Sequence, residues 1–241
     1  MSSIYQHIIT AKAKGEKLLA VLIDPDKMKL EAVSSFISKI NQSIATHIFV
    51  GGSEVDEGIT EILVDKIKKH TSLPVVLFPG DVIQITDKAD GILFLSLISG
   101  RNPEYLIGKH VEAVSRLKGT NLEVIPTGYL LIENGKETSV QRVSKTKPIK
   151  RSEIQIIKDT AKAGEFLGMK LIYLEAGSGA THAIEPEIIL KVKQKLTIPL
   201  IVGGGIKSIA ELKSAYNAGA DLLVIGTAFE EDEAFFNDIK K

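Results

Sequence analysis

Eight short apolar runs, spaced along the whole chain, are the feature that most constrains the fold. Runs rich in Val, Ile and Leu are typical of strands that are buried on both faces of a parallel sheet. Nearly all of them end in Gly, Asp or Thr, as strands do when they deliver polar residues to a shared rim. The runs are Leu18–Asp24, His47–Gly52, Pro74–Gly80, Gly91–Leu97, Leu122–Gly128, Leu171–Gly177, Pro199–Gly205 and Leu222–Thr227.

Segments with helical spacing and charged outer faces separate most of these runs. Strands that alternate with helices predict an α/β fold, and eight of them predict a (βα)8 TIM barrel before they predict an open sheet. One such barrel uses about 250 residues, so the 241 residues predict a single domain over residues 1–241. The expected helices lie within Leu30–Ile40, Asp56–His70, Pro103–Lys118, Arg151–Leu167, Glu185–Leu196 and Ser208–Ala218.

Two segments depart from this alternation. Asp81–Asp90 has only ten residues between the third and fourth strands, whereas a crossover helix with its loops needs at least about 10–12. We therefore expect the third helix to be missing or replaced. The other segment, Tyr129–Lys150, is long and follows the fifth strand at the rim, where a solvated surface loop and a substrate lid are equally good interpretations.

Composition and charge exclude several classes of protein. Lys and Arg number 30, as do Asp and Glu, and the net charge of +0 removes the basic face that nucleic acid binding requires. The chain has no cysteine, so neither a disulfide framework nor a thiolate metal site can form, which fits a reducing cytoplasm. Leu18–Ile23 is too short for a signal peptide or a membrane span, and we expect no integral membrane segment near the N-terminus.

Glycines follow the seventh and eighth predicted strands, as Gly203–Gly205 and as Gly226 before Thr227. Barrel enzymes commonly bind phosphate in these two loops, because clustered backbone N–H groups there point at the anion. Ser208 is a suitable N-cap for the following helix. Tight strand-to-helix turns would explain either loop alone, but the two in this order favour a phosphate site.

The sixth predicted strand ends in the run Tyr173–Ala180. Alternation along the strand sends Tyr173 and Glu175 to one face and Leu174 to the other. A carboxylate at this end of a barrel strand is costly to bury unpaired. Glu175 therefore faces a substrate or a cation, or else belongs to a structural ion pair.

Hard oxygen ligands follow the first two predicted strands, where the chain reads Asp24-Pro25-Asp26 and Gly51-Gly52-Ser53. Carboxylate and hydroxyl oxygens suit a Mg²⁺ ion that keeps some waters and shares phosphate oxygens with a substrate. Asp24 lies nearer the strand end and is the better candidate ligand. We expect Asp26 instead to be an N-cap or a first-turn residue of the following helix.

Taken together, these motifs resemble those of the geranylgeranylglyceryl phosphate synthase family. The resemblance covers nearly the whole chain, and its most specific part is the run after strand six. The stretch Pro126–Ile132 with Thr138–Val140 resembles the larger subgroup, which has archaeal and some bacterial members. The family also has a barrel with a replaced third helix. The motifs are Leu22–Lys27, Gly51–Ser53, Phe78–Gly80, Pro126–Tyr129, Tyr173–Ala180, Gly203–Ile206 and Gly226–Thr227.

The resemblance implies transfer of a geranylgeranyl group from its diphosphate to the 3-hydroxyl of sn-glycerol 1-phosphate, a step of ether lipid synthesis. It implies that Asp24 and Ser53 bind Mg²⁺, and that the protein is a homo-oligomer, either a dimer or a hexamer. We expect Glu175 to accept the hydroxyl proton and Tyr173 to add a hydrogen bond. The implied glycerol phosphate residues are Tyr173, Leu174, Glu175, Ala176, Gly177, Ser178, Gly179, Gly203, Gly204, Gly226 and Thr227.

The prenyl tail needs an apolar groove, and the gap left by the third helix is the place where we expect it. Candidate lining residues are Leu95, Leu97, Ile98 and Tyr105. Other interpretations stay open: a heptaprenylglyceryl phosphate synthase, another phosphate-binding barrel such as an isomerase or lyase, or a barrel that binds a phosphorylated metabolite without catalysis.

Overall fold

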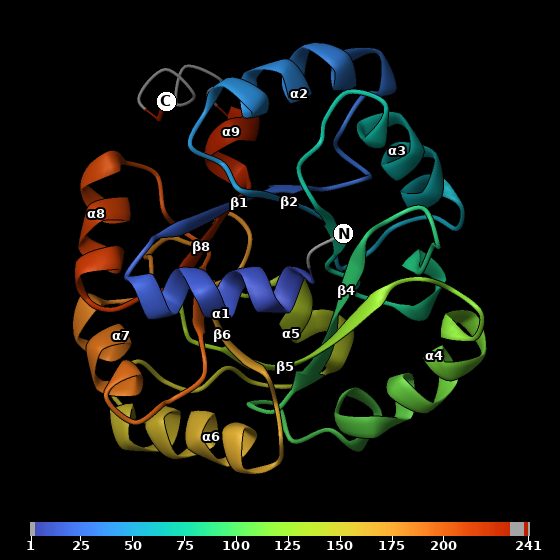
Figure 1. Cartoon of the computed structure of the whole chain (residues 1–241). Coiled ribbons are helices and arrows are strands. Elements are labelled where there is room, and N and C mark those ends of the chain that lie inside the picture. Colours follow the sequence, from blue (N-terminus) through green and yellow to red (C-terminus); the bar gives the residue numbers. More distant parts are fainter. Residues whose placement is uncertain (1–2, 232–238, 241) are drawn as a thin grey trace.

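A computed structural model describes residues 3–231 and 239–240, and in it eight parallel strands close into a barrel (Figure 1). Each strand pairs with the next along the chain, and β8 pairs with β1. The predicted TIM barrel is confirmed. The strands are β1 (Leu18–Ile23), β2 (His47–Val50), β3 (Val75–Leu77), β4 (Gly91–Leu97), β5 (Glu123–Leu131), β6 (Leu171–Glu175), β7 (Leu200–Gly203) and β8 (Leu222–Ile225).

Helices surround the barrel and follow the predicted segments, while α1, α5 and α9 were not predicted (Figure 1). Within the described residues, no helix is both long enough and apolar enough to cross a membrane. The helices are α1 (Ile4–Lys14), η1 (Leu30–Ala32), α2 (Val33–Gln42), α3 (Ile59–Lys68), the π-helical turn η3 (Glu104–Gly108), α4 (Lys109–Leu117), α5 (Ser139–Ser144), α6 (Ile154–Phe166), α7 (Pro186–Lys193), α8 (Ile209–Asn217) and α9 (Thr227–Glu231).

The connection between β3 and β4 contains no α-helix. A single 3-10 turn, η2 (Val82–Gln84), takes its place. Asp81 caps this turn, since its side chain accepts a hydrogen bond from the Ile83 N–H at 3.2 Å. The prediction that the third barrel helix is replaced is therefore confirmed.

Alternating side chains of the strands form two apolar layers. Leu174 of β6 belongs to the layer between the barrel and its helices, together with residues of those helices. Tyr173, its neighbour, belongs to the layer inside the barrel. The alternation predicted for this strand is thus observed, and it decides which side chains can reach the barrel axis.

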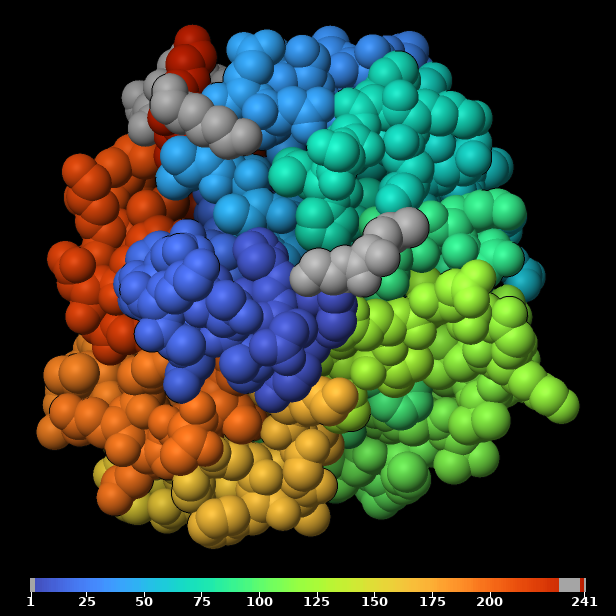
Figure 2. Space-filling view, in the orientation of Figure 1, coloured from blue at the N-terminus to red at the C-terminus, as the bar shows by residue number. Residues whose placement is uncertain are grey.

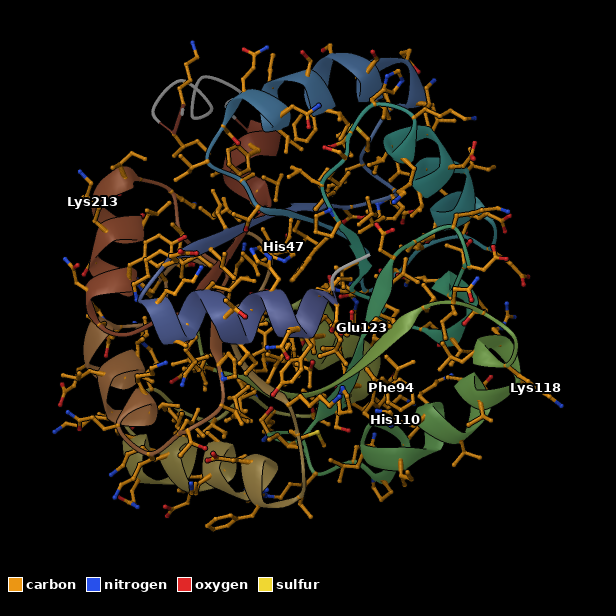
Figure 3. All side chains as sticks on the ribbon, in the orientation of Figure 1. His47, Phe94, His110, Lys118, Glu123 and Lys213 are labelled. Atoms are coloured by element: carbon orange, nitrogen blue, oxygen red, sulfur yellow. The ribbon has the colours of Figure 1, made fainter. Side chains whose placement is uncertain are left out.

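Helix α1 closes the N-terminal end of the barrel, and its atoms lie over the middle of that face (Figures 1 and 2). Ile4, Ile8 and Ala11 pack into the apolar layer inside the barrel. The Glu123 carboxylate at the start of β5 accepts hydrogen bonds from the Ser3 hydroxyl and from the first N–H groups of the helix, at 2.5–3.0 Å (Figure 3). A carboxylate at a helix N-terminus also stabilises the helix dipole. An open site must therefore lie at the opposite end.

Candidate active site

A cavity of about 410 Å³ occupies the C-terminal ends of the strands. This volume is within the ~300–1,000 Å³ of small-molecule sites. Two groups of predicted residues meet there. The glycine side consists of Gly177–Gly179, Gly204–Gly205 and Gly226–Thr227, after β6, β7 and β8. The carboxylate side consists of Asp24, Gly52, Ser53 and Gly80, after β1, β2 and β3.

Glu175, the last residue of β6, lies in the wall of this cavity and is only 6% exposed. Its Oε1 accepts a hydrogen bond from the Gly177 N–H at 2.6 Å. Burial raises the pKa of Glu175 above its ordinary value, although the Gly177 N–H, the adjacent Tyr173 hydroxyl and the Ala176 N–H act in the opposite direction. In the described part of the chain, these groups include no basic side chain, so the structure does not support a structural ion pair.

Three aromatic rings form the floor beside Glu175. The ring centroids of Phe78, Tyr129 and Tyr173 are 5.3–5.9 Å apart. Burial, with a smaller effect of the Glu175 carboxylate, holds the pKa of both tyrosines well above the ordinary value. The Tyr173 hydroxyl lies beside that carboxylate, yet within the described residues it makes no hydrogen bond of standard geometry. A buried hydroxyl without a partner favours binding of a polar ligand group.

The glycine side is a concave surface of backbone groups. Gly204 and Gly205 have φ values of +82° and +74°, which favour glycine. A Cβ on Gly204 would also lie 2.3 Å from the Glu175 Oε1. Thr227 joins two loops, because its Oγ1 accepts a hydrogen bond from the Gly179 N–H at 3.2 Å. Successive N–H groups in such loops make an anion-binding nest.

Three predicted substrate-binding residues do not line the cavity. Leu174 and Ala176 are in the layer outside the barrel. Gly203 lies underneath, where a Cβ would be 2.4 Å from the Tyr173 hydroxyl oxygen and 2.9 Å from the Glu175 Oε2. Gly203 therefore makes room for the two catalytic candidates. Ser208 is the N-cap of α8, as predicted, and its hydroxyl accepts from the Glu211 N–H.

On the carboxylate side, the Asp24 Oδ1 accepts a hydrogen bond from the Asp26 N–H at 3.2 Å, and the Lys27 Nζ is 3.5 Å from Oδ2. The expectation that Asp26 caps or begins a helix is wrong, because η1 begins only at Leu30. The Asp24 side chain turns the chain back at Asp26, in the manner of an Asx turn. Asp26 lines the cavity instead.

The carboxylate side has the donors that a Mg²⁺ ion needs, though in small number. A Cβ on Gly52 would be 2.7 Å from the Asp24 Oδ1, which places this carboxylate directly against the backbone that precedes Ser53. The described residues contain no cluster of three His, Cys, Asp or Glu that could hold a metal. Mg²⁺ commonly takes one or two carboxylates and completes its shell with waters and substrate phosphates. Asp24 and Ser53 fit that kind of site.

The segment after β5 is part of the cavity wall at residues 138–140, whereas its turn at residues 135–137 is exposed to solvent. The Asn134 side-chain amide donates to the Ala176 carbonyl. Thr138 and Gln141 form a capping box that begins α5, a signal visible in the sequence but missed. Val140 of that helix lines the cavity. The Lys136 Nζ lies 3.1 Å from the position of a Cβ on Gly179, so this segment also brings a cation to the glycine side.

An apolar wall lies on the side where the third helix is replaced. Leu95, Leu97 and Tyr105 line it as expected. Ile98 does not, because its side chain packs outside the barrel, toward Gly128 and Gly164. Further residues line the wall without having been predicted, namely Val82, Ile85, Phe94, His110, Ala113 and Val143.

Known proteins match this chain along nearly its whole length. A model of the PcrB family matches residues 11–241. The geranylgeranylglyceryl phosphate synthase of Flavobacterium johnsoniae is 58% identical, over 98% of this chain and 98% of its own. That of Thermococcus gammatolerans is 42% identical, over 94% and 89%. The crystal structure of (S)-3-O-geranylgeranylglyceryl phosphate synthase from Thermoplasma acidophilum, in complex with substrate sn-glycerol-1-phosphate, is 32% identical, with a TM-score of 0.92 over 99% of this chain and 96% of that one.

These relatives are both bacterial and archaeal, in agreement with the predicted subgroup. Their identity of 42–58% over nearly the full length of the chain assigns it to this family of enzymes, and not to the isomerases, the lyases or the non-catalytic barrels that share the fold. The chain belongs to the PcrB family, that of the geranylgeranylglyceryl phosphate synthases, and is a prenyltransferase.

Proposed function

We propose that this chain transfers a geranylgeranyl group from geranylgeranyl diphosphate to the 3-hydroxyl of sn-glycerol 1-phosphate, with Mg²⁺. One observation carries the proposal: a single cavity places the buried Glu175 carboxylate between the glycine side and the carboxylate side, next to an apolar wall. The names of the relatives, and the sn-glycerol-1-phosphate bound in the Thermoplasma acidophilum enzyme, support the same reaction.

In this proposal, the phosphate of glycerol phosphate binds the glycine side. Backbone N–H groups of Gly204 and Gly205 approach the anion without a Cβ in the way. The Thr227 hydroxyl and the Lys136 ammonium lie at the Gly179 backbone, where they can contact the same phosphate. Fixing the phosphate there directs the glycerol hydroxyl groups toward β6.

Glu175 accepts the proton of the attacking hydroxyl. As the hydroxyl oxygen forms a bond to the first prenyl carbon, the bond to the diphosphate breaks and the hydroxyl proton passes to the carboxylate. The raised pKa of Glu175, caused by burial, makes its carboxylate a stronger base than an exposed one. Tyr173, whose hydroxyl has no other well-formed hydrogen bond among the described residues, orients the glycerol hydroxyl.

Asp24 and Ser53 would hold Mg²⁺ on the carboxylate side, where the ion would neutralise the charge of the leaving diphosphate. The prenyl chain then lies along the apolar wall, where each buried methylene contributes about 0.8 kcal/mol. Leu95, Leu97 and Tyr105 are part of that wall.

The proposal includes a homo-oligomer, either a dimer or a hexamer. Ile107, Val111 and Val114 lie along one side of η3 and α4 and are 60–67% exposed. Glu104 precedes this stripe and Lys118 follows it, both exposed. Two copies packed antiparallel would therefore pair apolar residues in the middle and opposite charges at both ends. Light scattering after size exclusion tests this: Val111→Glu should lower the mass, whereas a monomeric wild type would overturn it.

The activity itself is tested with labelled sn-glycerol 1-phosphate, Mg²⁺ and separate prenyl diphosphates of increasing length, with mass analysis of the ether product. The proposal predicts a geranylgeranyl ether that disappears with EDTA. A heptaprenyl ether as the main product would assign the chain to the other subgroup, and an ether formed without divalent metal would contradict the role of Mg²⁺. The cytoplasmic location expected from the sequence stays a prediction.

A further inference from the structure

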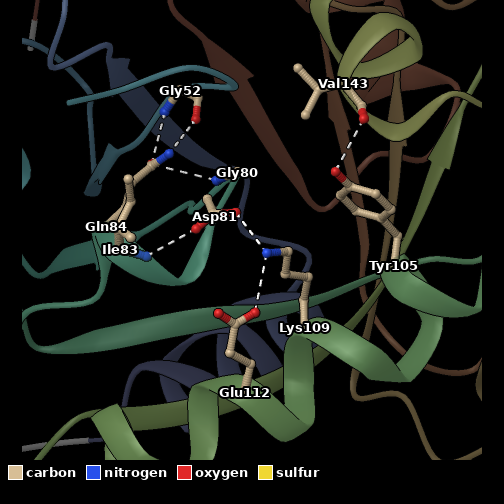
Figure 4. A network of polar contacts seen from close by, with 9 residues as sticks. All are labelled: Gly52, Gly80, Asp81, Ile83, Gln84, Tyr105, Lys109, Glu112 and Val143. Atoms are coloured by element: carbon tan, nitrogen blue, oxygen red, sulfur yellow. Dashed lines mark hydrogen bonds and ion pairs between the residues drawn. The ribbon is translucent and has the colours of Figure 1, made fainter. Parts of the chain in front are cut away.

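Gln84 is a buried amide in the turn that replaces the third helix. It is only 2% exposed. Its Nε2 donates to the Gly52 carbonyl at 2.7 Å, and its Oε1 accepts from the N–H groups of Gly52 and Gly80 at 3.3 and 3.4 Å (Figure 4). One side chain thus satisfies three backbone groups of two different strand ends.

These backbone groups lie beyond the regular pairing of β2 and β3. The last bond between the two strands runs from the Phe78 N–H to the Val50 carbonyl. Past that point the Gly52 N–H and carbonyl both need another partner, because buried backbone groups are costly when unpaired. The Gln84 side-chain amide is that partner, and it pairs with both groups as the backbone of a neighbouring strand would. A Cβ on Gly80 would be 2.5 Å from the Gly52 carbonyl oxygen, so the two strand ends are in direct contact.

The position of Gln84 is itself fixed by an ion pair at the cavity wall. The Gln84 N–H donates to the Asp81 carbonyl at 3.2 Å, within η2. The Asp81 carboxylate is 3.0 Å from the Lys109 Nζ, which also contacts Glu112 at 3.1 Å (Figure 4). Lys109 of α4 therefore holds the turn in place. Because this connection is short and contains no α-helix, the Gln84 side chain can reach the rim.

The backbone that Gln84 holds leads directly to the carboxylate side. Gly52 precedes Ser53 and lies against the Asp24 Oδ1. A shift of Gly52 would move the Ser53 hydroxyl relative to Asp24, and two oxygens can share one Mg²⁺ only within a narrow range of distances. We infer that Gln84 is a positioning residue for the Mg²⁺ and diphosphate site, acting through the Gly52–Ser53 backbone. This inference rests on the proposed function.

Gln84→Met tests it, because methionine keeps the volume of the side chain and removes all three hydrogen bonds. Calorimetric titration with geranylgeranyl diphosphate, repeated at a series of Mg²⁺ concentrations, gives the Mg²⁺ concentration at which binding is half enhanced. Mutation of residues that orient metal ligands typically lowers metal affinity about 10- to 100-fold. We therefore expect this Mg²⁺ concentration to rise at least about tenfold. Binding of sn-glycerol 1-phosphate, on the far side of the cavity, should stay unchanged.

Ser43→Ala is the matched control. Ser43 is equally buried and also bonds two backbone groups, the Ile40 carbonyl and the Ala45 N–H, but it lies between α2 and the start of β2. Ser43→Ala should lower the unfolding temperature without changing the Mg²⁺ concentration that gives half-maximal enhancement of diphosphate binding. If Gln84→Met also leaves that concentration unchanged, Gln84 is only structural and the inference is overturned. If Mg²⁺ does not enhance diphosphate binding to the wild type, the proposed function fails instead.

Discussion

The glycine side and the carboxylate side of the cavity offer different chemical groups to an anion. On the glycine side the groups are mostly backbone N–H, and they are shaped by left-handed glycines such as Gly204 and Gly205. On the carboxylate side they are side-chain oxygens of Asp24 and Ser53, which stand on a backbone braced by Gln84. The first arrangement binds a phosphate directly, whereas the second needs a cation between itself and a diphosphate. One cavity can therefore hold two phosphorylated substrates without exchanging them.

The largest effect is expected at the boundary between the two sides. Glu175→Gln removes the base but can still accept the Gly177 N–H bond, so its geometry should persist. General bases contribute about 10²- to 10⁴-fold, and turnover should fall by that factor while glycerol phosphate binds as before. Steady-state kinetics together with calorimetry measure both quantities. Unchanged turnover would rule out the role of Glu175 as the base.

Gly204→Ala should damage the glycine side and leave the carboxylate side intact. A Cβ there would lie 2.3 Å from the Glu175 Oε1, and a non-glycine residue at this φ costs about 1–3 kcal/mol. We expect glycerol phosphate affinity to fall at least about tenfold, by titration calorimetry, and diphosphate affinity to persist. Gly168→Ala is the control, since Gly168 has φ +90° with nothing near its Cβ position. Equal loss of affinity in both variants would attribute the effect to backbone strain.

Lys136→Ala should have a smaller effect, limited to the same side. Lys136 is exposed, so its ammonium contributes only about 0.2–1 kcal/mol to phosphate binding, or about 1.5- to 5-fold in affinity. The difference should shrink as salt is raised, because exposed charges are screened. Titrations at low and high ionic strength check this. An affinity difference that does not depend on salt would indicate a structural effect of the loop.

The smallest effect concerns stability against pH. Burial raises the pKa of Glu175, so its contribution to stability is complete below the unfolded pKa of about 4.3 and is lost as pH rises through the folded value. The glutamine side chain of Glu175→Gln does not titrate. The unfolding temperature of the variant, measured relative to that of the wild type, should therefore rise from pH 4 to pH 8. A constant difference across this range would contradict the raised pKa.

Glu165→Gln is the control with the opposite sign. Burial raises the pKa of Glu165, but hydrogen bonds from Lys162 and Thr197 outweigh it and hold the pKa below the ordinary value. That contribution is present above the unfolded pKa and is lost as pH falls through the folded one. Glu165→Gln should therefore lose stability relative to the wild type at neutral pH, and the difference should close in acid. Parallel behaviour of the two variants would show that neither pKa shift is as described.

The sequence predicted the barrel well, because most strands are continuous apolar runs and the rim residues follow from where these runs end. Alternation along β6 correctly separated Tyr173 and Glu175 from Leu174. Helix α1 was missed although Ile4, Ile8 and Ala11 repeat at helical spacing, since a helix before the first strand has no place in the alternating pattern.

Other features were not predicted, mostly because they depend on contacts between segments that are distant in the sequence. Gln84 is one polar residue in a short connection, and its role depends on backbone groups of Gly52 and Gly80 that only the closed barrel brings near. The wall formed by α5 depends on Asn134 reaching the end of β6, a contact across 42 residues. Asp26 was assigned to a helix because Asp-Pro-Asp is also a helix-entry signal. In the structure the Asp24 side chain accepts the Asp26 N–H instead, a competition that spacing alone cannot reveal.

The cavity should contain two independent subsites, and a crossed titration tests this most directly. Asp24→Ala and Gly204→Ala are each titrated with sn-glycerol 1-phosphate alone and with geranylgeranyl diphosphate plus Mg²⁺. Asp24→Ala should lose only the Mg²⁺-dependent binding of the diphosphate, and Gly204→Ala only the binding of glycerol phosphate. If each variant loses both ligands to the same extent, the two sides are one site and the division proposed for this cavity is contradicted.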